Sequence, residues 1–361
     1  TGLVDPNRKL VAFVSNTVRF STVPTGINGT DVAHWLYIND GAVSEPVLIT
    51  GGTASPTNRT NATITFTPMN PHLGNTWSIT SATAGIMEAN VSAGPGFDVS
   101  VGPGLWNIYA PIVLSAGSGI YGTSGGTYLN RAFAAGHFIT VVGVSSAFVS
   151  VHDIYLTSSV AALANYYTLY ALDSNVYVNN VQIIGGAGAH WGGIFIEGSH
   201  LKLSSVFIGN YAGIGLRVGS AGHAVHTTVN GLTLTTSDAG ATAMLLFNGL
   251  CNISDFHSQL GNAASTSGHI IIQGGFGEST IVGGTLDGGA FRIACGDNGV
   301  ASFSIVVANM LMTGGAQPDS FGIILSNDFI YSKFVGCTFS GVGSATKPTI
   351  EISGASTVEF T

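Results

Sequence analysis

The chain of 361 residues is long enough for a large buried core, and it is 45% hydrophobic and only 8% charged, which excludes a disordered chain. Ten Lys and Arg against eighteen Asp and Glu give a net charge of −8 without any basic run, so we expect no nucleic-acid partner. No apolar run approaches the ~18 residues of a membrane helix and the three cysteines lack metal-ligand spacing, so we expect no membrane insertion, no metal site and no cofactor.

Residues 1–82 are predicted to form a separate small β-rich domain. The runs 35–38, 47–49 and 62–66 have the apolar or alternating pattern of strands in hairpins. The polar, Gly-rich stretch 51–61 lies between the last two and is expected to be a loop.

Residues 84–122 are predicted to open a solenoid that occupies 83–361. A short helix near 84–92 would cover the first coil, where unpaired strand edges must be hidden. Strands of this coil are expected at 97–101, 104–106 and 112–114, followed by a closing turn at 119–122.

From residue 151 a six-residue core recurs in segments of about 22–29 residues, usually with apolar residues at its first, fourth and sixth positions. The cores are VHDIYL from Val151, VNNVQI from Val178, LSSVFI from Leu203, VNGLTL from Val229, ISDFHS from Ile253, IVGGTL from Ile281, VANMLM from Val307 and FVGCTF from Phe334. A second strand follows each core, usually after a glycine. The segments are too short for crossover helices, and an antiparallel sandwich would need hairpin turns every ~8–12 residues. The repeat therefore favours an all-β fold, a right-handed parallel β-helix whose coils stack ~4.8 Å apart.

Two positions of the repeated core predict the geometry of each coil. The third is always a small residue that tolerates a left-handed backbone, as a corner between strands requires: Asp153, Asn180, Ser205, Gly231, Asp255, Gly283, Asn309 and Gly336. The fourth is predicted to point inward: Ile154, Val181, Val206, Leu232, Phe256, Gly284, Met310 and Cys337. Cys337 is accordingly expected to be a buried, inert thiol.

The opening of the solenoid resembles that of the pectate lyase-like β-helix superfamily. There a capping helix precedes a V-x-V-P-P-G-x-Y … P-I-x-L … I-x-G run, and here 99–104, 111–114 and 120–122 follow the pattern, with Gly102 and Trp106 as departures. The resemblance covers roughly residues 84–361. It implies a fold shared by phage tailspike depolymerases, polysaccharide lyases, glycoside hydrolases and non-catalytic surface proteins, and with it a glycan partner.

The second strands contain the best candidate for chemistry. Aligning residues 193–197 with 213–217 places Glu197 and Arg217 in one outward row, which continues through Phe247, Gln273 and Ser326. A carboxylate beside a guanidinium, an aromatic ring and an amide would suit catalysis on a sugar; the other interpretation is a surface ion pair in an ordinary stack. The sequence has no paired-Asp signature and no Asp cluster typical of a calcium site.

Other candidates lie near the ends of these strands. His190, Trp191 and Tyr211 are predicted to bind substrate, with His223 and His226 in the next coil, although Trp191 could equally pack against a coil edge. His200 and Lys202 are expected in a solvated turn. His257 is expected on the surface, in a row with Tyr155, Gln182, Phe207 and Thr233.

These observations favour a secreted or virion-borne β-helix that binds a polysaccharide and depolymerises it as tailspikes do, as a lyase or a glycosidase. The alternative is a non-catalytic structural or adhesive protein of a surface or appendage. The low number of Asp and Glu residues, eighteen in the whole chain, favours this alternative. A homotrimer or another homo-oligomer is implied by the spikes it resembles. Five sequons are compatible with glycosylation: Asn28, Asn58, Asn61, Asn90 and Asn252.

Overall fold

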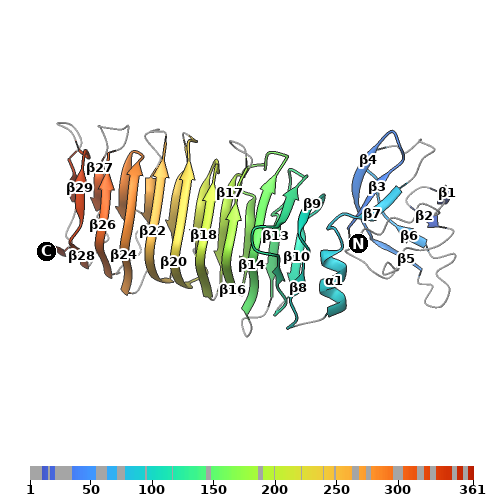
Figure 1. Ribbon diagram of the computed structural model, residues 1–361, viewed down its shortest axis with the longest axis horizontal. Coiled ribbons are helices and arrows are strands. Elements are labelled where there is room, and N and C mark those ends of the chain that lie inside the picture. The colour runs from blue at the N-terminus through green and yellow to red at the C-terminus, as the bar shows by residue number, and fades with distance from the viewer. Residues whose placement is uncertain are drawn as a thin grey trace.

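The computed structural model shows an elongated stack of parallel coils, with helix α1 (Ile86–Ala93) and two small antiparallel sheets at one end (Figure 1). The residues that the structure describes are 10–14, 17–20, 35–53, 63–70, 78–93, 96–115, 117–143, 148–185, 190–198, 200–220, 222–238, 240–247, 249–261, 268–273, 278–295, 304–314, 321–325, 331–343, 348–352 and 357–361. Within these residues no helix is long and apolar enough to cross a membrane, and no cluster of His, Cys, Asp or Glu could hold a metal ion.

The N-terminal strands pair antiparallel, unlike those of the coils. One sheet has the order β1-β2-β6-β5, with β1 (Leu10–Val14), β2 (Thr17–Phe20), β6 (Thr63–Thr65) and β5 (Gly51–Thr53). The other has the order β4-β3-β7, with β4 (Ser44–Leu48), β3 (Trp35–Asn39) and β7 (Ser78–Ser81). The loop predicted at 51–61 is wrong at its start, because β5 pairs with β6 there; a three-residue strand with two glycines has no alternation to reveal it. Residues 54–61 lie outside the described residues, and the domain boundary near residue 82 stays a prediction.

The coils contribute strands to two long parallel sheets, so the predicted parallel β-helix is confirmed. The ten-stranded sheet contains β10 (Ile112–Ser115), β13 (Ile139–Val142), β15 (Tyr167–Leu172), β17 (Gly192–Glu197), β19 (Ile214–Val218), β21 (Thr242–Leu246), β23 (Gly268–Ile272), β25 (Phe291–Cys295), β27 (Phe321–Leu325) and β30 (Ile350–Ile352). The fourteen-stranded sheet contains β8 (Val99–Ser100), β9 (Gly104–Ile108), β11 (Ile120–Tyr121), β12 (Thr127–Arg131), β14 (Phe148–Ser158), β16 (Asn175–Ile183), β18 (His200–Gly209), β20 (Val225–Thr236), β22 (Gly249–Leu260), β24 (Glu278–Gly288), β26 (Ser304–Thr313), β28 (Tyr331–Val335), β29 (Thr338–Ser340) and β31 (Thr357–Phe360).

Each long strand of the fourteen-stranded sheet bends at the corner residue predicted from the repeat. All eight corner residues have positive φ, between 50° and 73°. The corner residue shifts the alternation of inward and outward side chains by one position. Val151 and Ile154, on either side of Asp153, are therefore both buried. Both halves of the strand therefore face the core. The predicted corner row is confirmed.

The inward row beside the corners forms part of one continuous apolar core. Strand register stacks its members in successive coils, from Ile154 on Val181 through to Gly284 on Met310. The prediction for Cys337 is wrong in degree: the residue packs against the core but is only half-buried, since it lies near the C-terminal end of the stack. Burial still raises the pKa of its thiol.

Helix α1 lies where the capping helix was predicted, against β8 and β10 of the first coil (Figure 1). Ile86 is buried and packs into the solenoid core. The Thr83 and Ser81 hydroxyls accept hydrogen bonds from the backbone N–H groups of Met87 (3.4 Å) and Gly85 (3.0 Å). The helix thus covers the apolar end of the stack.

Candidate functional site

A row of three rings and one guanidinium runs across four coils on the outer face of the ten-stranded sheet. We call His137, Tyr170, Phe195 and Arg217 the aromatic ladder. The His137 and Tyr170 rings stack with centroids 4.3 Å apart, and the Tyr170 and Phe195 centroids are 5.3 Å apart. The Arg217 guanidinium carbon lies 4.3 Å from the centre of the Phe195 ring. Strand register puts Tyr170, Phe195 and Arg217 directly beside one another, which is why the rings meet.

A carboxylate stands beside this ladder. The Tyr170 hydroxyl donates a hydrogen bond of 2.7 Å to Glu197 Oε2. Burial and the nearby Glu197 carboxylate raise the pKa of Tyr170, so the phenol stays protonated and keeps donating. Both side chains are half-buried, and a ligand on this face can reach them.

A second carboxylate lies one coil away. The Asp173 backbone N–H donates to the Glu197 carbonyl at 2.7 Å, which makes the two acids neighbours at the ends of β15 and β17. The Asp173 side chain is 65% exposed and lies 3.3 Å from His223 Nδ1. Two acids, an imidazole and a phenol can together move protons on a bound sugar.

A fully buried arginine fixes the segment that carries His137. Arg131 donates from Nε to the Phe133 carbonyl and from Nη2 to the carbonyls of Ala134 and Gly136, each at 2.8 Å. Burial lowers the pKa of Arg131 to about 10, which still leaves it charged near neutral pH. Burial, and next the Arg131 charge, lower the pKa of His137, whose Nδ1 accepts the Tyr167 N–H at 3.0 Å. His137 is therefore held neutral and oriented.

The predicted alignment of Glu197 with Arg217 is wrong by two residues. Arg217 pairs with Phe195, and Glu197 pairs with Leu172 of the preceding coil. No ion pair joins Glu197 to Arg217, both of which are described residues. The backbone bonds do continue the row of Glu197 through Gly219 to the half-buried Phe247 and Gln273, whereas Ser326 lies outside the described residues.

Two residues predicted to bind substrate lie in the interior. His190 and Tyr211 are fully buried and form a bridge between adjacent coils. His190 Nδ1 lies 2.9 Å from the Thr168 hydroxyl and Nε2 lies 3.1 Å from the Ile184 carbonyl. Neither side chain can contact a ligand on the surface, because both are enclosed in the interior of the coils. Trp191 is half-buried, edge-on to Tyr167 with ring centroids 5.2 Å apart.

Buried histidines make stability depend on pH. Burial lowers the pKa of His190 to about 4 and that of His269 to about 3. Between roughly pH 6.5 and these values the unfolded chain binds protons that the folded chain does not, so stability falls as pH falls. We expect each histidine to remove about 2 kcal/mol of unfolding free energy between pH 7 and pH 5. Urea unfolding of H269Q, which keeps a donor toward the Gly288 carbonyl, should show this loss reduced by that amount; an unchanged loss would contradict the assignment.

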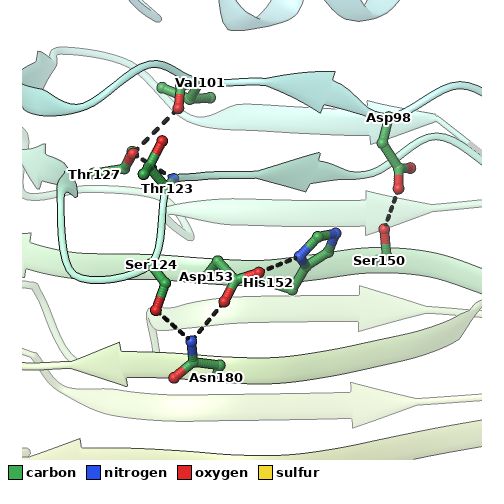
Figure 2. A network of polar contacts seen from close by, with 9 residues as sticks. All are labelled: Asp98, Val101, Thr123, Ser124, Thr127, Ser150, His152, Asp153 and Asn180. Atoms are coloured by element: carbon green, nitrogen blue, oxygen red, sulfur yellow. Dashed lines mark hydrogen bonds and ion pairs between the residues drawn. The ribbon is translucent and has the colours of Figure 1, made fainter.

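The corner acids serve the turns of the coils. Figure 2 shows the Asp153 carboxylate between His152 Nδ1 (2.9 Å) and Asn180 Nδ2 (2.5 Å), and Asn180 also reaches the Ser124 hydroxyl. The hydrogen bonds from His152 and Asn180 lower the pKa of Asp153. Asp255 likewise contacts His257 Nε2 at 2.8 Å. The register confirms the predicted row of His257.

The turn predicted at His200 and Lys202 is wrong: these residues begin β18, where they alternate with the buried Leu201 and Leu203. Sequence reasoning also missed His137, Tyr170, Phe195 and Asp173. Phe195 lay within a predicted strand, and its outward position was the available signal; no strand was predicted around Tyr170.

No family model matches the sequence, and no curated protein matches it. Solved structures with a similar fold include the A-module of the mannuronan C-5 epimerase AlgE4 of Azotobacter vinelandii, 12% identical with a TM-score of 0.42 over 77% of this chain and 95% of that one. The catalytic domain of a GH87 α-1,3-glucanase is 12% identical, with a TM-score of 0.39 over 97% and 90%. The enzymatically active domain of bacteriophage CBA120 tailspike protein 2 is 11% identical, with a TM-score of 0.43 over 97% of this chain and 54% of that one. The likeness concerns the fold alone: by its own strand pairing this chain is a parallel β-helix, as the pectate lyase-like resemblance implied.

Proposed function

We propose that the protein binds a polysaccharide on the outer face of the ten-stranded sheet and cleaves it there, outside a cell or on a virion. The observation that supports this most is the Tyr170–Glu197 hydrogen bond of 2.7 Å beside the aromatic ladder. Sugars have apolar ring faces and polar edges. A surface that combines the half-buried rings of His137 and Tyr170 and the buried ring of Phe195 with a carboxylate and a guanidinium matches both.

Cleavage requires proton transfer at the glycosidic bond. Glu197 is the acid–base candidate, because a fixed phenol orients its carboxylate and the adjacent Asp173 offers the second carboxyl that hydrolysis of a glycoside uses. Arg217 is the candidate for holding negative charge on the substrate. Its guanidinium lies over the Phe195 ring and the side chain is only half-buried, so an anionic group of the substrate can approach it.

The proposal is tested by incubating the protein with a panel of neutral and acidic polysaccharides. We expect at least one member to bind and to release either new reducing ends, from hydrolysis, or products that absorb in the ultraviolet, from elimination. An R217Q variant should bind that polysaccharide about tenfold more weakly, since a charge-assisted contact is lost. Absence of binding across the panel would refute the proposal.

One observation favours a non-catalytic structural or adhesive role instead. Beyond Arg217 the same outward row is aliphatic and half-buried, with Leu245, Ile271, Ala294 and Ile324 in successive coils. Such a stripe suits contact with further copies of this chain in a homotrimer or another homo-oligomer. Light scattering that shows a stable oligomer, together with binding but no cleavage across the panel, would select this second function.

A further inference from the structure

A polar groove lies on the fourteen-stranded sheet, on a different face from the aromatic ladder. Its cavity volume is about 230 Å³, and two outward rows of β18, β20 and β22 form its walls. One wall consists of His200, His226 and Leu250, and the other of Lys202, Thr228 and Asn252. The buried Leu201 and Thr227 lie beneath them.

The walls carry positive charge and no acid, although the chain as a whole has a net charge of −8. Lys202 Nζ lies 4.9 Å from the centre of the Phe148 ring, and no carboxylate of the described part of the chain forms an ion pair with it. Lys333, five coils further along the same row, does have such a partner: its Nζ lies 2.8 Å from Glu359 Oε1. Lys202 thus keeps a charge that is available to a ligand.

Other groups of the groove are also held in place, and one of them, Asn252, has an unused donor. His200 Nδ1 contacts Asn175 Oδ1 at 3.0 Å, which leaves Nε2 directed elsewhere, and the His226 ring stands edge-on to His200 with centroids 5.1 Å apart. Asn252 Oδ1 accepts the Thr280 hydroxyl at 2.9 Å, which leaves its NH₂ group to donate. An ammonium, an amide NH₂ and a hydroxyl around one small cavity form a site for a compact anion with hydroxyl neighbours.

We propose that this groove is a second glycan site, selective for a sugar residue that carries a carboxylate or a sulfate. Lys202 pairs with the anionic group, Thr228 and Asn252 bond the ring hydroxyls, and Leu250 covers an apolar patch of the ring. The inference rests on the proposed function for the class of ligand, a glycan, but not for the site. It adds an anchoring surface that does not overlap the ladder.

The probe is a homogeneous oligogalacturonate, titrated by calorimetry, with its fully methyl-esterified form as the neutral counterpart. We expect the acidic form to bind and the ester to bind at least tenfold more weakly, and K202Q to weaken the acidic form by about tenfold. K333Q, whose lysine is already paired, is the matched control and should bind as the native protein does. A sulfated galactan oligosaccharide, titrated in parallel, shows which anion is preferred.

Ring-proton NMR resonances of His200 and His226, assigned through H200N and H226N, locate the binding. We expect them to shift with the acidic oligosaccharide in the native protein and in R217Q, because Arg217 belongs to the other face. Equal affinity of native protein and K202Q, or unmoved histidine resonances, would overturn the groove site and leave the proposed function standing. Retained binding in the groove, with no glycan binding at the aromatic ladder, would overturn the proposed function and leave the groove site standing.

Discussion

Replacing Gly284 with alanine is expected to lower the free energy of unfolding by more than about 4 kcal/mol, whereas the same change at its neighbour Gly283 costs about 1 kcal/mol. A Cβ at Gly284 would lie 1.9 Å from the Phe256 carbonyl oxygen and 2.7 Å from its carbonyl carbon. Those atoms belong to the backbone of the adjacent coil and cannot rotate away. At Gly283 nothing lies within 4 Å, so only the φ of +71° is unfavourable.

The two substitutions form a matched pair, because they are adjacent, chemically identical and both require a positive φ. Urea unfolding followed by far-UV circular dichroism and by tryptophan fluorescence gives their difference. The destabilisation by G284A can be so large that no soluble, sheet-containing protein is obtained. If G283A folds normally under the same conditions, that outcome also supports the prediction. Losses within 1 kcal/mol of each other would mean that β22 and β24 do not approach as closely as described.

This pair also separates what the sequence can reveal from what it cannot. The corner residue at each third core position was predictable, because a left-handed backbone selects small residues such as Asn180 and Gly231, and that selection recurs in every coil. Gly284 occupies an inward position that in every other coil holds a larger side chain, from Cys, Val, Ile and Leu to Met and Phe. Glycine is required there because the backbone of Phe256 in the adjacent coil leaves no room for a Cβ. No local sequence pattern reveals a contact with another coil.

The candidate site was predictable only in part, for a reason of geometry. Sequence alignment matched Gly193 with Gly213, but the strands pair Ile194 with Leu216, so Gly193 lies against Gly215. A slip of two residues keeps every side chain on its own face of the sheet, so alternation cannot detect it. The outward face of β17 was therefore correct while the neighbour of Arg217 was not. The aromatic ladder was not predicted, because its four members are different residue types and so do not form a recurring position in the sequence.

The E197Q variant is expected to lose cleavage of the glycan by a factor of ~10²–10⁴, the usual contribution of a positioned proton-transfer group. Gln replaces one carboxylate oxygen with NH₂ and keeps the size of the side chain. Its remaining oxygen can still accept the hydrogen bond from the Tyr170 hydroxyl, which in the native protein lies 2.7 Å from Glu197 Oε2. Folding and glycan binding should therefore survive, and the loss should fall on kcat rather than on KM.

Two further variants make the assignment specific. E351Q changes an exposed acid in the same outward row as Arg217, five coils from it, and should cleave normally. Y170F removes only the hydroxyl that orients Glu197, so it should lower kcat by less than E197Q does, with its rings still stacked. Native turnover in E197Q would remove Glu197 from the reaction. Equal losses in E197Q and E351Q would mean that the acids act through the general charge of the face, because a group that transfers a proton must touch the scissile bond and Glu351 lies too many coils away to do so.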